Sequence, residues 1–566
     1  MNWENWEAHP HDYDFIQKIL DKVPRSFWKH IQEKYNHIKI SENRQASNLY
    51  LVDLEEKFKS MKLRLDSDDQ DIRDLAKKEA ATCKRITANS KNNKRAISKL
   101  ANYSKHYGIL EPKANTEMGI IKRYGCERWW RRKLRQMHGQ KVEEIALHLN
   151  IVNKNKEIYA SNAAVTRRRG QKTRNRNILE EIEAVNELGD SFTLQELSDK
   201  SVSNPKLQRA ELMTRIAGFE IVSKELGHVG EFYTLTCPSR MHSSLHYRGQ
   251  ANSKYDGTTP KQAQVYLVKM WSHIRTALAN KGIPICGIRV TEPHHDGTPH
   301  WHLMLFMKPE HQKIVREIFQ KHALKIDGDE KGAQEYRFKA IVIDPNKGTA
   351  AGYIAKYISK NIDGHGIESD TYGHNAITSA ERIDTYVSTW GLRQFQFFGS
   401  PPVTIWRELR KSTIESKDKN IQKAFEAANA GNWAEFLKIM GGPLVGKNDR
   451  PIQLLMAWSD KPGRYDEPVG QTIIGIESDK DSVITRVHIW TISQKSEKSC
   501  SNSENFRNPQ PDISENPGNT LADSSENFGK SRADISENSE NLRPGDSESF
   551  RNLLSEFSEY SEYFSE

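Results

Sequence analysis

One stretch, TEPHHDGTPHWHLMLF (291–306), restricts the fold more than any other part of the chain. Its Asp-Gly pair followed by an apolar run predicts a β-hairpin whose second strand is buried. Side chains two residues apart on a strand point to the same face. His300 and His302 are therefore expected to project together, while Trp301 packs on the opposite face. A pair of imidazoles beside a carboxylate indicates a candidate metal site.

The length of the turn decides whether Glu292 can join the two histidines. A two-residue Asp-Gly loop would pair Glu292 with Trp301 and turn the carboxylate away. A three-residue loop, His295-Asp296-Gly297, with its Gly in the left-handed conformation that this loop type prefers, pairs Glu292 with His300 instead. We therefore predict Glu292, His300 and His302 as three ligands, with positions left open for substrate. This ligand set suits several divalent ions, Mg²⁺ and Mn²⁺ among them.

The hairpin lies within a region, 216–410, where strand and helix patterns alternate. Strands are expected at 231–239, 284–293, 300–307 and 335–344, and helices at 261–282, 309–325 and 347–362. The order β-α-β-β-α-β-α predicts an α+β unit with one mainly antiparallel sheet and helices on one face. The other face of the sheet would then be free to carry a site.

The basic character of the chain points to a polyanionic partner. Lys plus Arg total 84 against 75 Asp plus Glu, and two clusters stand out, KRYGCERWWRRKLR (122–135) and TRRRGQKTRNR (166–176). Such runs are commonly solvated helix faces, but the tryptophans of the first cluster favour nucleic acid, because indoles stack on bases while guanidiniums hold phosphates. The residues expected to contact DNA are Arg128, Trp129, Trp130, Arg131, Arg132, Lys133, Arg167, Arg168 and Arg169.

The last predicted helix contains GYIAKYISKN, in which Tyr353 and Tyr357 are four residues apart and share one face. Aromatics at this spacing are commonly core residues, but Lys356 and Lys360 lie on an adjoining face and would suit a phosphate. A phenol, with a pKa of about 10, needs help to attack at neutral pH, which a metal and a nearby ammonium can supply. The pattern predicts transesterification of a DNA phosphate, with Tyr353, Tyr357 and Lys356 as catalytic residues.

Composition divides the chain into five regions. They are a helical N-terminal region (1–110), a basic helical DNA-binding region (111–215), the α+β unit (216–410), a small mixed accessory region (411–494) and a Ser/Glu/Asn-rich tail (495–566). The tail repeats Ser-Glu-Asn and is predicted to be disordered. The five cysteines form no CxxC pair, which argues against a disulfide framework or a zinc ribbon. With no signal-peptide pattern and no long apolar run, we expect a cytoplasmic protein.

Several of these motifs resemble those of the HUH endonucleases. TPHWHLMLF is similar to their His-hydrophobic-His strand, FYTLT (232–236) resembles the strand motif that precedes it, and YIAKYISKN resembles the two-tyrosine motif of rolling-circle initiators. ERIDTYVSTWG and RQFQFFGSPPVTIWRELR extend the resemblance to the phage replication gene A protein family. The resemblance covers roughly residues 100–410.

What the resemblance implies is an HUH-type sheet and a site-specific single-strand nickase that starts rolling-circle replication of phage DNA in a bacterial host cell. Tyr353 or Tyr357 would take the 5′-phosphate and leave a free 3′-OH, and the other tyrosine would cut the regenerated origin. The implied partners are single-stranded or supercoiled origin DNA and a host helicase with the replication machinery; no membrane is involved.

Other functions stay open from the residues alone. They are a relaxase or single-strand transposase of the same superfamily, and a non-catalytic DNA-binding protein with a structural metal site. A relaxase usually places its nucleophilic tyrosine near the N-terminus, unlike this chain. Structural zinc sites usually contain cysteine, and no cysteine pair is present.

Overall fold

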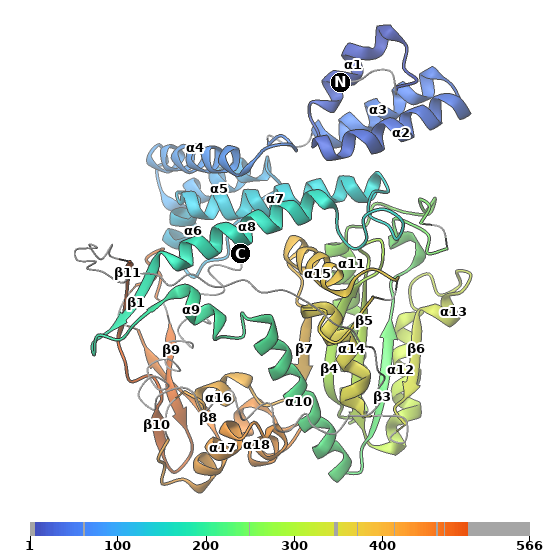
Figure 1. The fold of residues 1–566 in the computed structure, drawn as a ribbon. Helices are drawn as coiled ribbons and strands as arrows, with labels where there is room; N and C mark the ends of the chain where they lie inside the picture. The colour runs from blue at the N-terminus through green and yellow to red at the C-terminus, as the bar shows by residue number, and fades with distance from the viewer. Residues whose placement is uncertain are drawn as a thin grey trace, which may run out of the picture.

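A five-stranded antiparallel sheet carries the predicted hairpin (Figure 1). The computed structural model describes residues 6–495 except 60–62, 248, 345–348, 371, 412–413, 460–461 and 469. In spatial order the strands are β6 (Phe338–Val342), β3 (Val229–Leu235), β5 (Pro299–Met307), β4 (Cys286–Pro293) and β7 (Phe395–Phe398). The helices around them are α10 (Pro205–Glu225), α11 (Pro260–Asn280), α12 (Gln312–Ala323), α13 (Ala333–Tyr336), α14 (Ala350–Ile362) and α15 (Ala376–Trp390). The predicted strands and helices of this α+β region all form, and α13, α15 and the fifth strand β7 were not predicted.

Helices cover both faces of this sheet, so the prediction that they lie on one face is wrong. Strands β4 and β5 are buried at every position. Trp301 and Leu303 of β5 pack on one side in the same core as residues of α11 and α12. Met304 and Phe306 pack on the other side with α10 and α14. A strand that is apolar on both faces needs cover on both, as in a three-layer arrangement, and the site must therefore lie at one end of the sheet.

Helix α14 is placed on the sheet by its apolar residues. Thr349 caps it, because its hydroxyl accepts a hydrogen bond of 3.0 Å from the Gly352 amide. Ile354 and Ile358, one turn apart, are fully buried against the strands. This orientation leaves the tyrosine face of the helix at the margin of the core.

Residues 13–180 are mostly helical, and these helices lie along one edge of the molecule (Figure 1). Short strands at 182–186 and 191–193 interrupt the helical region that was predicted up to residue 215. The helices of residues 13–180 are α1 (Tyr13–Leu20), α2 (Arg25–Ser41), α3 (Arg44–Lys59), α4 (Asp69–Ala88), α5 (Asn93–Lys105), α6 (Glu117–Tyr124), α7 (Glu127–His148) and α8 (Asn162–Glu180). Helices α4 to α7 bury a common core, whereas α2 and α3 contribute to a second core with the C-terminal half of α7 and with α15. Among the described residues, no helix combines the length and the apolar character that crossing a membrane requires.

The structure contains two smaller sheets. One has the order β11-β1-β2 and joins segments far apart in the chain, pairing Ile182 with Gln494. The other, β10-β9-β8, lies beside three short helices. The remaining elements are β1 (Ile182–Asn186), β2 (Ser191–Thr193), α9 (Leu194–Asp199), α16 (Val403–Glu408), α17 (Lys419–Asn429), α18 (Trp433–Ile439), β8 (Gln453–Trp458), β9 (Gln471–Glu477), β10 (Ser482–Ile484) and β11 (Trp490–Gln494). The predicted disordered tail falls outside the described residues, apart from Lys495.

The stability of the central sheet should depend on Gly287. Its φ is 151°, and a Cβ atom there would lie 1.9 Å from the carbonyl oxygen of Met304. Gly282, just after α11, has a φ of 66° but open space around it. We expect Gly282→Ala to cost about 1 kcal/mol through backbone strain alone. Gly287→Ala should cost clearly more, measured as a larger drop in the thermal unfolding midpoint. Equal drops for the two variants would mean that the strands separate without penalty.

Candidate active site

The hairpin between β4 and β5 has the register that the three-residue loop predicts. Glu292 pairs with His300 across the two strands. The His294 amide donates to the Thr298 carbonyl at 2.8 Å, and Gly297 adopts a φ of 77° in the loop. A shift of one residue would have turned the carboxylate to the opposite face. The predicted facing of the acid and the histidines is confirmed.

The three predicted ligands come together at the end of the sheet. The Glu292 Oε2 atom lies 3.6 Å from His302 Nε2 and 3.9 Å from His300 Nε2, and the two Nε2 atoms are 2.9 Å apart. These donor atoms fall within 4.8 Å of one another, and all three side chains are largely buried. Two imidazole nitrogens and a carboxylate oxygen converging in this way could hold a divalent metal ion.

The charges of the group also suit a metal. Burial by itself would raise the pKa of Glu292, but the Lys360 ammonium and hydrogen bonds from His302 and Asn361 outweigh it and lower the pKa to about 2. Burial lowers the pKa of His300 well below its usual value, and His302 and Lys360 add to the effect. At neutral pH the group therefore contains an ionised carboxylate and a neutral His300, the forms that bind cations.

A second layer of side chains orients these ligands. Thr234 Oγ1 lies 3.1 Å from Nδ1 of His302, which leaves Nε2 directed at the group. Asn361 donates to Glu292 and also to the carbonyl oxygen of Tyr357, at 2.6 Å for the latter. Gln394, next to β7, donates to Asn361 Oδ1 at 2.9 Å. Asn361 thus links the tyrosine helix directly to the carboxylate.

The two tyrosines lie on α14 beside this group. The ring of Tyr357 lies 4.2 Å from the ring of His302 and 5.0 Å from that of Phe232, measured between centroids. Burial, followed by the Glu292 charge, raises the pKa of Tyr357. Tyr353, one turn earlier, is half-buried against the same core. The structure thus brings Tyr357 into contact with a ligand and leaves Tyr353 one helical turn away.

The lysine at the centre of the group is Lys360 rather than Lys356. Lys360 is buried, and its Nζ atom lies 3.3 Å from Glu292 Oε2. Lys356 is exposed and makes no hydrogen bond or ion pair within the part of the chain that the structure describes. The sequence spacing could have indicated this, because Lys360 and Asn361 follow Tyr357 by three and four residues, which places both beside it on the helix surface.

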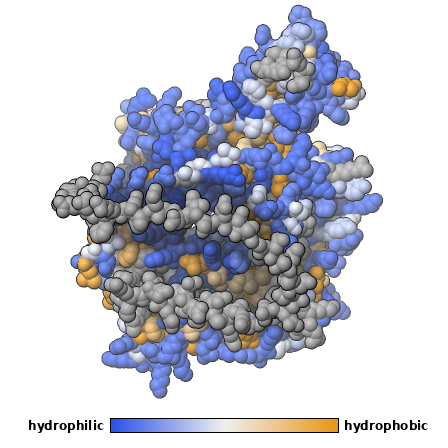
Figure 2. All heavy atoms as spheres, viewed as in Figure 1, coloured by the Kyte–Doolittle hydropathy of each residue, from blue (hydrophilic) through white to orange (hydrophobic). Residues whose placement is uncertain are grey.

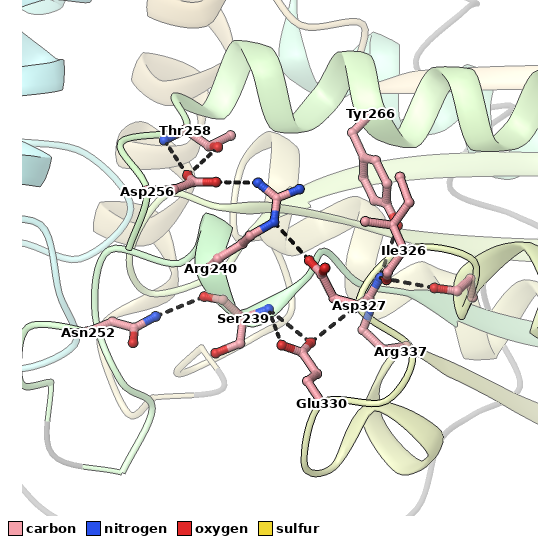
Figure 3. Close-up of polar contacts among 11 residues, drawn as sticks. Ser239, Arg240, Asn252, Asp256, Thr258, Tyr266, Ile326, Asp327, Glu330 and Arg337 are labelled. Carbon is pink, nitrogen blue, oxygen red and sulfur yellow. Dashed lines mark hydrogen bonds and ion pairs between the residues drawn. The ribbon is translucent and has the colours of Figure 1, made fainter. Parts of the chain in front are cut away.

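The loop between β3 and α11 supports the hairpin turn from outside. Buried Asp296 accepts a hydrogen bond from His242 Nδ1 at 3.1 Å. A polar network then fixes the loop itself (Figure 3). Arg240 donates a hydrogen bond to Asp327. Glu330 accepts hydrogen bonds from the Ser239 amide and from Arg337. These contacts hold the turn in place although most of the loop has no regular structure.

The residues predicted to bind DNA divide into two groups. Trp129 and Trp130 are 2% and 0% exposed and pack edge to face in the core of α4 to α7. The prediction that they stack on bases is therefore wrong: on α7 their apolar area is used to hold helices together. Arg128 and Arg132 are exposed, and Arg131 and Lys133 are half-buried.

The second basic cluster is partly neutralised by acids of α15. Arg168 Nε lies 3.1 Å from Asp384, and Arg169 Nε lies 2.6 Å from Glu381. Arg167 donates to the carbonyl oxygen of Gly139 at 3.5 Å. These arginines therefore also join α8 to α7 and α15, a role that their sequence does not reveal.

Removing a ligand should abolish tight metal binding. Even supporting residues around metal sites are worth 10–100-fold in affinity, so we expect His300→Ala or His302→Ala to weaken Mn²⁺ binding by about 100-fold or more in titration calorimetry. His273→Ala, which removes an exposed histidine of α11, is the control and should leave binding unchanged. Unchanged affinity in the His300 and His302 variants would contradict the ligand assignment.

The buried ammonium of Lys360 should compete with a cation for Glu292. We expect Lys360→Gln to raise Mn²⁺ affinity roughly tenfold, because a positive charge next to the site is removed. The matched variant Lys356→Gln, on the exposed side of the same helix, should change affinity by less than about twofold because solvent screens it. A loss of affinity in Lys360→Gln would instead mean that the lysine is needed to orient the carboxylate.

The sequence of this chain is similar to those of known proteins. The model of a family described as bacteriophage replication gene A protein (GPA) matches residues 47–365, which include the Glu292, His300 and His302 group and both tyrosines. No solved structure matches the chain.

Three curated relatives are similar over about two thirds of the chain. The replication gene A protein of Escherichia phage 186 is 40% identical over 66% of this chain and 58% of its own length. The probable replication protein P12 of Pseudoalteromonas phage PM2 is 38% identical over 67% and 60%. A probable replication endonuclease from a prophage-like region of Salmonella paratyphi A is 36% identical over 62% and 46%. The chain thus spans about half of the length of these relatives, and it belongs to the bacteriophage replication gene A protein family.

Proposed function

We propose that this protein is a site-specific single-strand DNA endonuclease and strand transferase that initiates and terminates rolling-circle replication of phage DNA. The contact between Tyr357 and His302 carries the proposal, since it brings a phenol to the edge of a group able to hold a metal. The names of the relatives, replication gene A protein and probable replication endonuclease, support a nuclease acting in phage replication.

The residues of α14 and the hairpin would share the chemistry. Mg²⁺ or Mn²⁺ held by Glu292, His300 and His302 would withdraw electron density from a phosphate oxygen. The phenol oxygen of Tyr357 attacks the phosphorus atom, and its proton is released to water. The bond from phosphorus to the 3′ oxygen breaks, and that oxygen takes up a proton and leaves as a 3′-OH. The DNA 5′-phosphate remains esterified to the tyrosine, so the energy of the phosphodiester bond is kept.

Lys360 would provide the positive charge that this step needs. The pKa of Tyr357 is raised by burial and by the Glu292 carboxylate, so the phenol is protonated in the absence of DNA. An ammonium beside the carboxylate stabilises negative charge that develops on the tyrosine or on the phosphate. Lys360 is also close enough to the group to supply the proton that the 3′ oxygen takes up. We therefore assign to Lys360 the role expected from sequence for Lys356.

Two tyrosines would allow the reaction to be completed. Once one is esterified it cannot cut again, yet finishing a circle requires a second cut at the regenerated origin. Tyr353 and Tyr357 lie one helical turn apart on the same face, so a small shift of α14 would exchange them at the ligand group. The 3′-OH released by the second cut then attacks the first phosphotyrosine and closes the displaced strand. A host helicase would open the duplex ahead of the 3′ end.

The two-tyrosine proposal predicts distinct behaviour for single and double variants. Tyr353→Phe and Tyr357→Phe should each keep some cleavage of a single-stranded origin oligonucleotide, and the double variant should keep none. Each single variant should fail to release closed circles. Covalent adducts are mapped by mass spectrometry of the tryptic peptides. Tyr50→Phe, in the N-terminal helices, is the control and should cleave and circularise normally.

The residue that carries the covalent adduct distinguishes two alternating tyrosines from a single nucleophile. If an adduct forms only through one tyrosine, the other is a packing residue and alternation is wrong. If no adduct forms in the wild-type protein with Mg²⁺ or Mn²⁺, the transesterase proposal itself is wrong.

A further inference from the structure

Two basic grooves lie on either side of α7. The first has a volume of about 980 Å³ and runs between α2, α4, α7, α8 and α15. The second has a volume of about 840 Å³ and runs between α7 and the segment that joins α5 to α6. Both are lined by Arg132, Lys133 and Gln136, so they meet at one point of the helix. The face of the molecule over α4, α7 and α8 is largely hydrophilic (Figure 2).

The first groove is connected to the ligand group by the chain segment that follows α15. Its wall includes residues 387–392 at the end of α15, and Gln140 of α7 fixes this wall by donating to the carbonyl oxygen of Thr389 at 3.0 Å. The chain then continues through exposed Arg393 to Gln394, which bonds Asn361 beside Glu292. Only a few residues of chain therefore separate the wall of this groove from the candidate active site.

The first groove is lined by ion pairs between helices and by further basic side chains. Arg135 and Asp69 form an ion pair at 2.7 Å, and Arg168 and Asp384 form another at 3.1 Å. These pairs join neighbouring helices and hold the walls in position. Additional basic side chains in the lining are Arg25, Arg132, Lys133, Arg167 and Arg174. The lining also contains the acids Asp66 and Asp68, and its basic side chains still outnumber its acidic ones.

The second groove extends the positive lining on the other side of α7. Its basic residues are Lys105, Lys113, Arg123, Arg132, Lys133 and Lys141, and its acids are Glu111 and Glu144. Leu110 is 83% exposed at this groove, a large apolar side chain surrounded by basic residues. Cations interspersed with apolar surface suit a nucleic acid strand, which presents phosphates and flat bases together.

We propose that the two grooves form one track for single-stranded DNA, which crosses α7 at Arg132 and Lys133 and leads to the ligand group. This inference rests on the proposed function, because that function supplies the reason for DNA to reach Glu292. The ligand atoms are buried, so a phosphate can meet them only if its backbone enters the protein, and a strand outside the duplex can do so. The first groove would hold the nucleotides next to the scissile phosphate, and the second those farther away.

The proposed track predicts that residues of the first basic cluster (122–135) contribute unequally to DNA binding. Arg128 and Arg131 lie on the same helix as Arg132 and Lys133 and carry the same charge, but they line neither groove. A diffuse electrostatic attraction to DNA would depend on all four residues about equally. A strand lying in the grooves would depend on the second pair alone.

The test measures binding of a fluorescent single-stranded oligonucleotide by anisotropy, in EDTA so that no cleavage occurs. We expect Arg132→Glu/Lys133→Glu to weaken binding at least tenfold and to reduce the slope of log K against log salt by about 1.4, which is about 0.7 for each lost phosphate contact. The matched variant Arg128→Glu/Arg131→Glu should change affinity by less than about threefold. Arg132→Gln/Lys133→Gln, with an unchanged unfolding midpoint, guards against misfolding and should lose affinity in the same direction.

Several results would overturn the track. Equal losses in the two charge-reversal pairs would mean diffuse attraction, and no loss in either would mean that the grooves do not bind DNA. A loss confined to duplex oligonucleotides would mean that the grooves hold a double helix. The proposed function is tested separately by the covalent adduct. Selective loss of binding in the groove pair without any adduct in the wild type would retain the track and reject the nuclease.

Discussion

The pairing of Glu292 with His300 across one hairpin is the constraint on which the rest of the site depends. Three donor atoms converge only because the turn contains three residues, with Gly297 in the left-handed conformation. A shift by one residue would send the carboxylate to the face that packs on α11 and α12, away from Lys360 and Asn361. Asp296 and His242 brace the turn, so the register is held from both inside and outside the sheet.

The buried carboxylate adds polar contacts to the apolar packing that places α14 on the sheet. An ionised Glu292 inside the protein is tolerated only with compensating charge and hydrogen bonds, and α14 supplies both through Lys360 and Asn361. Asn361 also donates a hydrogen bond to the carbonyl oxygen of Tyr357. The tyrosine helix is thereby attached to the ligand group by the same contacts that make the group stable.

The helical half of the chain uses its tryptophans and arginines for different purposes. Trp129 and Trp130 supply the apolar area that holds α4 to α7 together. Arginines on the other faces of α7 and α8 line grooves or pair with acids of α15, whose end is continuous with the strand beside the site. The DNA-contacting surface that we propose is therefore built on the same helices that position α15.

The sequence by itself determined what depends on neighbouring residues. The order of strands and helices around the sheet, the register of the hairpin and the shared face of the two tyrosines all follow from periodicity, turn chemistry and helical spacing. Only the tertiary structure decided the rest: the cover on both faces of the sheet, the burial of Trp129 and Trp130, the choice of Lys360 over Lys356 and the pairing of β1 with β11. Each of these is set by contacts between segments far apart in the chain. A helix has several faces of similar composition, and which one is buried depends on the surface it meets, which no local pattern contains.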